Sequence, residues 1–340
     1  MASPNFLLDY ARRSEPRLRN FLDAKTAEIG KLPVDLKPAF AQLRDYVLRG
    51  GKRLRGALVE QGFRTAGDDP APALDPSIGI ELLHAYLLIH DDFMDRDEVR
   101  RGGPTIHAAL GGDHLAGSVA ILLGSLCQAW AWELVLAAPV GPERALKAAQ
   151  MLGKSLQDVT IGQTLDLLAT KVVALDARGV LEVQRLKTGS YTFELPLHLG
   201  ALLAGASQEK VDALTRYARP LGQAFQIADD LLGTFGAPEV TGKPNASDLR
   251  EGKRTLLVAR ALETATAADA EMLRVGLGRA GADVEALRDI LRRSGAVDSA
   301  RAEAERLRDE ALRALENAPF PATVAESLRE LAIYTVDRAA

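Results

Sequence analysis

The sequence predicts an all-α protein. Ala and Leu dominate its 340 residues and only 5% are aromatic, a composition that favours helices over strands. Apolar residues recur at helical spacing along nearly the whole chain, and no run alternates with period two for long enough to form a sheet. With 47% hydrophobic residues, the helices can bury a sizeable core.

The predicted helices follow one another with short breaks. One helix is expected to contain the apolar residues Val47-Leu48, Leu54, Leu58 and Val59. Further helices are expected over residues 78–95, 115–136, 144–169, 180–203, 211–235 and 254–264. The tail, 269–337, has the pattern of amphipathic helices with Arg and Glu faces.

Gly and Pro residues mark the breaks between these segments. Breaks are expected at Gly67-Asp68-Asp69-Pro70, Gly102-Gly103-Pro104, 139–142 and Gly236-Ala237-Pro238. No segment has low complexity, and none is long and polar enough to act as a linker between domains. A single domain over residues 1–340 is therefore expected.

Charge and cysteine content narrow the class of protein. The formal net charge of −4 argues against bulk nucleic-acid binding, because no basic face is supplied. Cys127 is the only cysteine, so no intrachain disulfide can form, and a cytosolic location is favoured. Its neighbours Leu126 and Trp130 indicate a packed rather than a reactive thiol. Residues 1–25 lack the apolar core of a signal peptide.

Residues 115–132 carry no charge and approach the length of a membrane span. Small and polar residues interrupt the segment, and Glu133 follows it directly. We interpret it as a core helix that is buried on all sides; the alternative is a membrane span.

The cluster Asp91-Asp92-Phe93-Met94-Asp95 ends an apolar stretch. On a helix, Asp91 and Asp95 lie about 40° apart around the axis, and His84 lies on the same stripe. Carboxylates this close repel each other, and Mg²⁺ is the cation best suited to relieve that repulsion beside phosphate oxygens. A solvated helix end is the alternative, but the apolar run Leu87-Leu88-Ile89 argues against it.

A second cluster, Asp229-Asp230-Leu231-Leu232-Gly233, also ends an apolar stretch. Gln226, Asp229, Asp230 and Gly233 fall at helical spacings of three and four residues. The fifth position is Gly, so this cluster has one carboxylate fewer than the first. Two such clusters together predict a site for Mg²⁺ and a diphosphate.

Positive charges accompany the two clusters. They occur in Gly51-Lys52-Arg53-Leu54-Arg55, in Arg100-Arg101, in Lys187-Thr188, and at Lys243 and Lys253. The glycine permits close backbone approach, and the cations suit a diphosphate. Each cation taken alone has the alternative reading of a solvated surface charge. We expect Arg53 to face the solvent.

These motifs, in this order, resemble those of the trans-isoprenyl diphosphate synthases, most closely the bacterial geranylgeranyl diphosphate synthases. The resemblance rests on Gly51-Lys52-x-x-Arg55, Asp91-Asp92-x-x-Asp95 with Arg100-Arg101-Gly102, Lys187-Thr188, Phe225-Gln226-x-x-Asp229-Asp230 and Gly242-Lys243-Pro244. The motif-bearing part runs from about residue 45 to residue 260. Geranylgeranyl diphosphate synthases of bacteria can carry the same Asp-Asp-Leu-Leu-Gly cluster.

The resemblance implies an antiparallel helical bundle around a deep central cavity (the isoprenoid synthase fold), a homodimer, and about three Mg²⁺ ions between facing Asp clusters. It implies Asp91, Asp95 and Asp229 as main ligands, with Asp92 and Asp230 acting through water. It assigns the allylic diphosphate to Arg100, Lys187, Gln226, Lys243 and Lys253. It assigns isopentenyl diphosphate to Lys52, Arg55, His84 and Arg101.

The implied reaction is head-to-tail condensation of isopentenyl diphosphate with an allylic diphosphate, with Lys187, Thr188 and Gln226 beside the reacting carbons. Tyr86 and Leu87 are the residues that would limit chain length, and one aromatic residue at these two positions indicates a twenty-carbon product. Leu87 projects about 40° from Asp91 and Tyr86 about 140°. Tyr86 can block a chain only if the tunnel runs beside the helix; otherwise it is an ordinary core residue.

Several alternatives stay open at this point. The product could be farnesyl diphosphate or a chain longer than twenty carbons. The chain could instead be a non-catalytic subunit of a heteromeric prenyltransferase. A class I terpene cyclase also uses an Asp-rich helix, but this chain has a second Asp pair and few aromatic residues.

Overall fold

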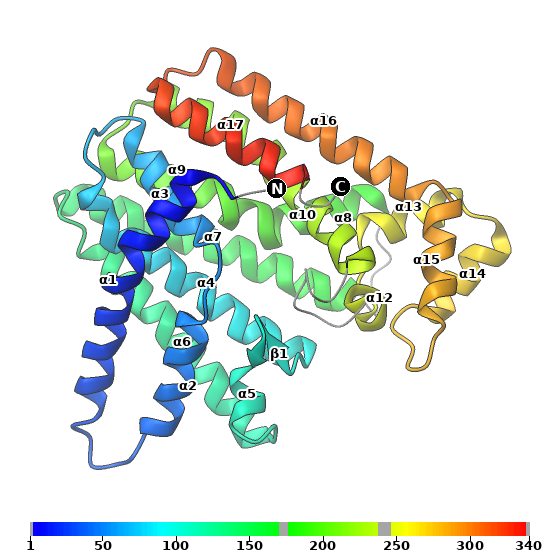
Figure 1. The fold of residues 1–340 in the computed structure, drawn as a ribbon, viewed down its shortest axis with the longest axis horizontal. Helices are drawn as coiled ribbons and strands as arrows, with labels where there is room; N and C mark the ends of the chain where they lie inside the picture. The colour runs from blue at the N-terminus through cyan, green and yellow to red at the C-terminus, as the bar shows by residue number, and fades with distance from the viewer. Residues whose placement is uncertain (1–2, 170–175, 237–245, 338–340) are drawn as a thin grey trace. The chain divides into compact units, whose positions relative to one another are not determined.

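The computed structural model describes residues 3–169, 176–236 and 246–337, and most of these residues are helical (Figure 1). The all-α prediction is therefore confirmed. The chain divides into two compact units: an N-terminal unit, Ser3–Gln150 with Leu199–Ala206, and a C-terminal unit, Met151–His198 with Ser207–Ala340. The single domain expected over residues 1–340 stays a prediction.

The N-terminal unit contains a series of helices and one small hairpin. Its elements are α1 (Asn5–Ile29), α2 (Lys37–Leu48), α3 (Leu54–Arg64), the 3₁₀ turn η1 (Ala71–Ala73), α4 (Leu74–Asp95), β1 (Val99–Arg100), β2 (Gly103–Pro104), α5 (Ile106–Ala109) and α6 (His114–Leu136). The two short strands pair antiparallel, Val99 with Pro104 and Arg100 with Gly103. The division between the units falls within α7 (Pro142–Ala169) and within α9 (Leu195–Ala204).

The described residues of the C-terminal unit form helices joined by short loops, with no strand among them. Its further elements are α8 (Ala177–Gln184), the π-helical segment η2 (Arg185–Glu194), α10 (Gln208–Phe235), α12 (Ser247–Glu251), α13 (Leu256–Thr264), α14 (Ala267–Gly276), α15 (Val284–Arg293), α16 (Ala296–Glu316) and α17 (Ala322–Asp337). Helices α16 and α17 pack side by side (Figure 1).

Side-chain caps explain where several helices begin. The Asp113 carboxylate accepts a hydrogen bond from the backbone N–H of Ala116 at the start of α6, at 2.8 Å. Asp176 and Asp283 cap α8 and α15 in the same way, and Thr255 caps α13. Each cap satisfies a backbone donor that has no partner inside its helix.

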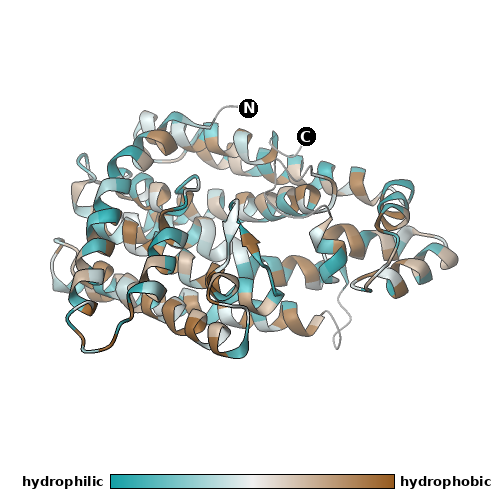
Figure 2. Cartoon of the chain, turned by 60° about the horizontal axis from the view of Figure 1, so that its bottom comes forward, coloured by the Kyte–Doolittle hydropathy of each residue, from teal (hydrophilic) through white to brown (hydrophobic). Residues whose placement is uncertain are grey.

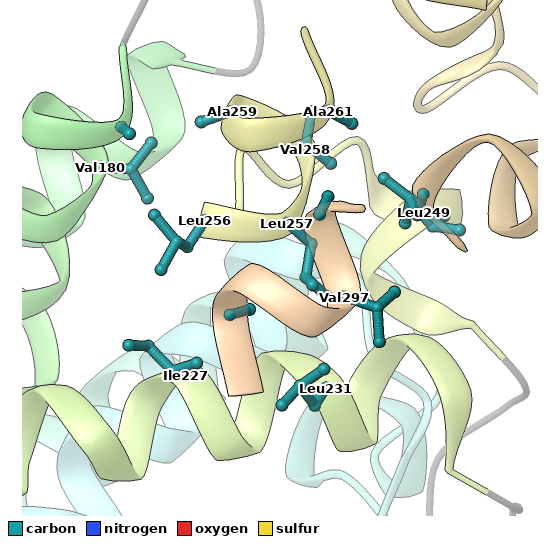
Figure 3. Close-up of a cluster of buried hydrophobic side chains, with 14 of the residues drawn as sticks. Val180, Ile227, Leu231, Leu249, Leu256, Leu257, Val258, Ala259, Ala261 and Val297 are labelled. Carbon is teal, nitrogen blue, oxygen red and sulfur yellow. The ribbon is translucent and has the colours of Figure 1, made fainter. Parts of the chain in front are cut away.

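The core of the C-terminal unit forms where the apolar faces of these helices meet. Figure 2 shows that hydrophobic and hydrophilic residues alternate along most helices, a pattern typical of helices with one apolar face. Figure 3 shows one buried cluster, in which Ile227 and Leu231 of α10 lie beneath Leu256 and Leu257 of α13. Val180 of α8 packs against the same cluster.

In the N-terminal unit, one sequence prediction was wrong and one helix was missed. The single helix expected around residues 47–59 is two helices, because Gly50 and Gly51 adopt φ values of 95° and 121° and end α2. Helix α1 was not predicted at all, because its charged residues obscure the apolar positions that it buries, such as Leu7, Leu18 and Leu22.

The helix expected over 115–136 is present as α6, but the prediction that it is buried on all sides was wrong. Only 44% of its most apolar window is buried, and Leu115 and Leu122 are 69% and 68% exposed. Within the described residues, α6 is the one helix long and apolar enough to cross a membrane by length and composition alone. Cys127 is buried in it, and burial raises the pKa of its thiol to about 12.

The helix expected over residues 180–203 is continuous but not uniform. Its central ten residues, Arg185–Glu194, form the π segment η2. Two glycines pack closely against this segment: a Cβ atom at Gly162 would lie 2.4 Å from the backbone nitrogen of Lys187, and one at Gly222 would lie 2.9 Å from Cα of Gly189. The neighbouring helices α7 and α10 therefore approach the backbone of η2 directly.

Candidate functional site

The loop between α2 and α3 gathers positive charge in the N-terminal unit. The guanidinium of Arg101 donates a hydrogen bond to the carbonyl of Gly50 at 2.6 Å. Its Cζ would lie 3.0 Å from a Cβ atom at Gly51, and the φ of 121° also requires glycine there. Lys52 follows and is exposed. The loop therefore brings two of the predicted diphosphate-binding cations together.

Arg49 ties this loop to the hairpin of β1 and β2. Its Nη1 atom donates to the carbonyl oxygens of Arg100 and Pro104, at 3.1 and 2.8 Å. Because the hairpin carries Arg100 and Arg101, this contact fixes the two predicted cations relative to the start of α3. Arg49 was not among the site residues predicted from the sequence.

Arg55 of α3 and His84 of α4 lie in contact. The Nη1 atom of Arg55 is 3.2 Å from Nε2 of His84. Burial lowers the pKa of His84 well below its ordinary value, and the charges of Arg55, Arg101 and Arg100 add to that effect. A neutral His84 accepts from Arg55 on Nε2, which leaves its proton on Nδ1 as a donor. His84 thus fits the predicted role of a hydrogen-bond donor to a diphosphate.

The position of Arg53 differs from the prediction. It was expected to face the solvent, but its side chain is only 4% exposed. Its Nη2 atom donates to the carbonyl of Val47 at 2.9 Å, and its Nη1 atom lies 3.7 Å from Oε2 of Glu81. An isolated buried guanidinium would be costly, and these oxygens supply the compensation.

Asp92 is the buried member of the first Asp cluster. Tyr46 donates its hydroxyl hydrogen to Oδ2 of Asp92 at 2.6 Å, and Nε of Arg100 donates to Oδ1 at 2.6 Å. Burial raises the pKa of Asp92, whereas Arg100 and Tyr46 oppose that rise. The carboxylate is therefore occupied in holding Arg100, and the expected action of Asp92 through water stays a prediction.

Asp91 and Asp95, one turn apart on α4, are partly exposed. Arg100 lies 3.8 Å from the Asp91 carboxylate. No three His, Cys, Asp or Glu side chains among the described residues are arranged to hold a metal ion by themselves. Mg²⁺ commonly binds through one or two carboxylates plus water and substrate phosphates, and two partly exposed carboxylates of one helix fit such a site.

Tyr86 and Leu87 are both half-buried on α4. The ring of Tyr86 contacts the ring of His90 edge-on, with 4.6 Å between centroids. His90 Nε2 in turn lies 2.9 Å from the carbonyl oxygen of Ile121 on α6. Tyr86 therefore belongs to the side of α4 that meets α6, and its role in chain length stays a prediction.

Lys187 lies in the C-terminal unit and is paired with an acid that sequence analysis missed. Its ammonium donates to Oδ2 of Asp166 on α7 at 2.6 Å, and both side chains are 22% exposed. Thr188 follows it in η2 and is half-buried. The signal for Asp166 was present: it is the single charge in the otherwise uncharged stretch 159–169.

Asp230 of the second cluster is buried between two amides. Nε2 of Gln184 donates to its Oδ2 at 2.6 Å, and Nε2 of Gln226 donates to its Oδ1 at 2.8 Å. Burial raises the pKa of Asp230 well above its ordinary value, and the charge of Asp248 adds to the rise. Gln226 opposes the rise, while Asp229 and Asp166 increase it further. No sequence pattern distinguished Gln184.

Asp248 of α12 occupies the space next to Gly233. A Cβ atom built on Gly233 would lie 2.2 Å from Oδ2 of Asp248 and 2.8 Å from its Cγ. The fifth position of the second cluster lacks a carboxylate, but a carboxylate from another helix stands beside it. Sequence analysis missed Asp248, because only the folded chain brings α12 against α10.

Lys253 and Lys243 are the remaining predicted cations. Lys253 pairs with Glu251, with 2.6 Å between Nζ and Oε2. Lys243, with its neighbours Gly242 and Pro244, lies outside the described residues. The described site residues thus fall into two sets: Lys52, Arg55, His84, Arg100, Arg101 and Asp91 to Asp95 in the N-terminal unit, and Asp166, Lys187, Gln226, Asp229, Asp230, Asp248 and Lys253 in the C-terminal unit.

Comparison with known proteins gives consistent matches. The polyprenyl synthetase family matches residues 37–293. Geranylfarnesyl diphosphate synthase of Aeropyrum pernix is 37% identical over 301 residues, which cover 85% of this chain and 91% of that protein. Geranylgeranyl diphosphate synthase of Methanosarcina mazei is 37% identical over 243 residues, 71% of this chain and 72% of that protein.

Solved structures match over nearly the whole chain. A geranylgeranyl pyrophosphate synthase from Corynebacterium glutamicum, crystallised with isoprenyl diphosphate and magnesium, has a TM-score of 0.92 and 34% identity, covering 97% of this chain and 98% of that chain. A polyprenyl synthase from Caulobacter crescentus, complexed with calcium and isoprenyl diphosphate, has a TM-score of 0.84 and 30% identity, covering 100% of both chains.

The raised pKa of Asp230 predicts a pH-dependent loss of stability. The folded protein holds this proton more tightly than the unfolded chain, so stability is full below the unfolded pKa and falls as pH rises toward the folded pKa. We expect Asp230→Asn to raise the melting temperature of the metal-free protein at pH 8 and to have little effect at pH 4. Thermal unfolding in chelator measures this difference.

The exposed Asp289, paired with Arg292 at the surface, provides the control for that measurement. Asp289→Asn should leave the melting temperature nearly unchanged at both pH values. A gain for Asp230→Asn that is equal at pH 4 and pH 8 would show that ionisation of the buried carboxyl group is not its cause.

Proposed function

This chain belongs to the polyprenyl synthetase family, and we propose that it makes geranylgeranyl diphosphate by adding isopentenyl diphosphate to allylic diphosphates, with Mg²⁺. It is an all-α prenyltransferase with the isoprenoid synthase fold. The curated relatives include synthases named for geranylfarnesyl, geranylgeranyl and farnesyl diphosphate, so trans-prenyl diphosphate synthesis is common to them and the chain length is our proposal.

One observation carries the proposal: the cation cluster around the start of α3 stands in the same unit as partly exposed carboxylates. Arg55 contacts His84, and Arg101 is fixed over Gly51. Arg100 is held by Asp92, in the same cluster as the partly exposed Asp91. A diphosphate needs several fixed cations, and a metal bridging to it needs carboxylates nearby.

In the N-terminal unit we assign Lys52, Arg55, His84 and Arg101 to isopentenyl diphosphate. Three of these residues are positively charged, and His84 donates a neutral hydrogen bond from Nδ1. Arg100 is assigned to the allylic diphosphate. Its contact with Asp92 orients the guanidinium before the substrate arrives, which lowers the entropy lost on binding.

In the C-terminal unit we assign Lys187, Gln226, Lys243 and Lys253 to the allylic diphosphate. Lys187 now pairs with Asp166, so it would exchange one anionic partner for another when substrate binds. Thr188, beside it in the π segment, would present a hydroxyl dipole to the reacting carbons. Gln226 is oriented by its hydrogen bond to Asp230.

We assign the metal to Asp91, Asp95 and Asp229, with Asp92 and Asp230 acting through water, and about three ions are expected. When bound, Mg²⁺ offsets the charge that develops on the departing diphosphate. Burial raises the pKa of Asp230, and the charges of Asp248, Asp229 and Asp166 add to the rise. A divalent cation would relieve this crowding of carboxylates.

The reaction follows from these assignments. The bond between the allylic carbon and the diphosphate oxygen breaks, and the cations of the site stabilise the diphosphate that leaves. The double bond of isopentenyl diphosphate then attacks the allylic carbocation, and the departed diphosphate takes up the proton that is lost. The allylic carbocation must be shielded from water. Apolar residues of α4 that precede the first Asp cluster, such as Leu87 and Leu88, are suited to this role.

We further propose that two copies of this chain associate through α6. Leu115, Leu122, Ala129 and Leu136 recur every seven residues and are all exposed, the three leucines at 69%, 68% and 49%. A heptad-spaced apolar stripe suits pairing with an equivalent helix. We also propose a cytoplasmic location, because the single cysteine is a buried free thiol.

The proposed activity is tested by incubating the purified protein with isopentenyl and dimethylallyl diphosphates and Mg²⁺, followed by chromatography of the dephosphorylated products. We expect a linear twenty-carbon alcohol. A cyclic hydrocarbon would indicate a terpene cyclase, and no product would indicate a non-catalytic subunit. We expect Asp91→Ala with Asp95→Ala to lower turnover about a hundredfold or more, whereas Asp9→Ala, at an exposed carboxylate of α1, should have no effect.

Tyr86 tests the proposed product length. Replacing its ring by a methyl group opens space beside α4, so Tyr86→Ala should yield products longer by one or more five-carbon units. Tyr86→Phe keeps the ring and should keep the wild-type product. Identical product distributions for the two variants would remove Tyr86 as the residue that stops elongation.

The proposed dimer is tested by light scattering coupled to size-exclusion chromatography. Leu122→Glu places a charge in the middle of the α6 stripe and should convert the protein to a monomer, because an unpaired buried charge is costly. Leu8→Glu, at a leucine of α1 that is 50% exposed, is the matched control and should stay dimeric. A dimer of unchanged mass for Leu122→Glu would place the interface elsewhere.

A further inference from the structure

Glu81 is a buried carboxylate three residues before His84 on α4. Its side chain is only 5% exposed. Its Oε1 atom accepts a hydrogen bond from the backbone N–H of Gly56, at 2.8 Å, in the first turn of α3. The carboxylate thus binds one of the backbone donors that a helix start leaves without an intrahelical partner.

Arg53, the residue immediately before α3, faces the other oxygen of this carboxylate. Its Nη1 atom is 3.7 Å from Oε2 of Glu81, and its Nη2 atom donates to Val47 at the end of α2. The backbone of Arg53 is left-handed, with φ 47° and ψ 36°, a conformation that residues other than glycine rarely adopt. The side-chain contacts hold the backbone in this conformation.

The pair stands among the cations that we assign to isopentenyl diphosphate. Lys52 and Arg55 flank Arg53 in the chain. Burial lowers the pKa of the Arg101 guanidinium, the charge of Glu81 opposes that effect, and the charges of Arg53 and Arg55 add to it. Glu81 is therefore a negative charge within a group of positive ones that would otherwise repel each other.

We propose that Glu81 and Arg53 are a positioning pair for isopentenyl diphosphate: the buried carboxylate holds Arg53 and the first turn of α3, so that Lys52 and Arg55 are fixed where the diphosphate binds. This inference rests on the proposed function. Neither residue is required to touch the substrate; both act through the backbone on either side of Lys52 and Arg55.

The sign of the effect separates positioning from simple electrostatics. Removing a negative charge from the neighbourhood of an anion strengthens its binding if charge alone matters. If Glu81 positions the cations, its loss weakens binding instead. Arg53 then keeps Glu15, 3.5 Å away, as its carboxylate partner, but the contact that joins it to the first turn of α3 is lost. The two effects have opposite directions, so one variant distinguishes them.

Glu81→Gln is the decisive variant, because the amide oxygen can still accept from Gly56 N–H while the charge is lost. We expect its KM for isopentenyl diphosphate to rise about tenfold, a change in binding of about 1.4 kcal/mol. The KM for the allylic diphosphate and kcat should change less than about threefold. Calorimetric titration with isopentenyl diphosphate should show the same weakening without turnover.

Glu60→Gln is the matched control. Glu60 is an equally buried carboxylate on α3, with 3% of its side chain exposed, and it pairs with Arg13 rather than with Arg53. Its loss should lower stability without raising the KM for isopentenyl diphosphate. A tenfold rise in both variants would assign the effect to general loosening of the unit and overturn the proposal.

Arg53→Lys keeps the net charge but loses the planar fork that reaches both Val47 and Glu81. It should raise the KM for isopentenyl diphosphate severalfold, and it decides the matter alone if Glu81→Gln does not fold. An active wild type whose two variants keep or lower that KM overturns the positioning pair only. A wild type that neither turns over nor binds isopentenyl diphosphate overturns the proposed function as well.

Discussion

The crowding of like charges is the constraint on which this structure depends. A protein that binds diphosphates must hold several cations together, and one that also binds Mg²⁺ must hold several carboxylates together, although each group repels its neighbours. The chain meets this constraint by pairing several of these groups with buried hydrogen-bond donors or with opposite charges. Asp92 lies between Tyr46 and Arg100, Asp230 accepts from two amides, and Glu81 stands among arginines.

Helices with apolar sides provide the rigid support that such groups need. The Asp clusters end helices α4 and α10, whose remaining turns are packed into the interior of their units. Glycines then allow neighbouring segments to come close, as Gly51 does beneath Arg101 and Gly162 does against η2. Repulsion within the site is thus opposed by burial of apolar surface elsewhere in the same unit.

Sequence periodicity predicted most of the helices and both Asp clusters, because these are local properties. Helices α4, α6, α7 and α10 begin or end within a few residues of the predicted limits. What the sequence could not supply were pairings between distant segments. Gln184 has no distinguishing neighbours, Arg53 looked like a surface charge, and Asp248 is brought against Gly233 only by the packing of α12 on α10.

The contact between Gly233 and Asp248 makes these two positions interdependent. Restoring an aspartate at position 233, to match the fuller form of the motif, would place two carboxylates in the space that now holds one. Such a change would be tolerated only together with a smaller or neutral residue at position 248. The effect of the fifth residue of the motif therefore depends on the residue at position 248. A residue taken from a homologue at position 233 alone would not have the effect that it has in that homologue.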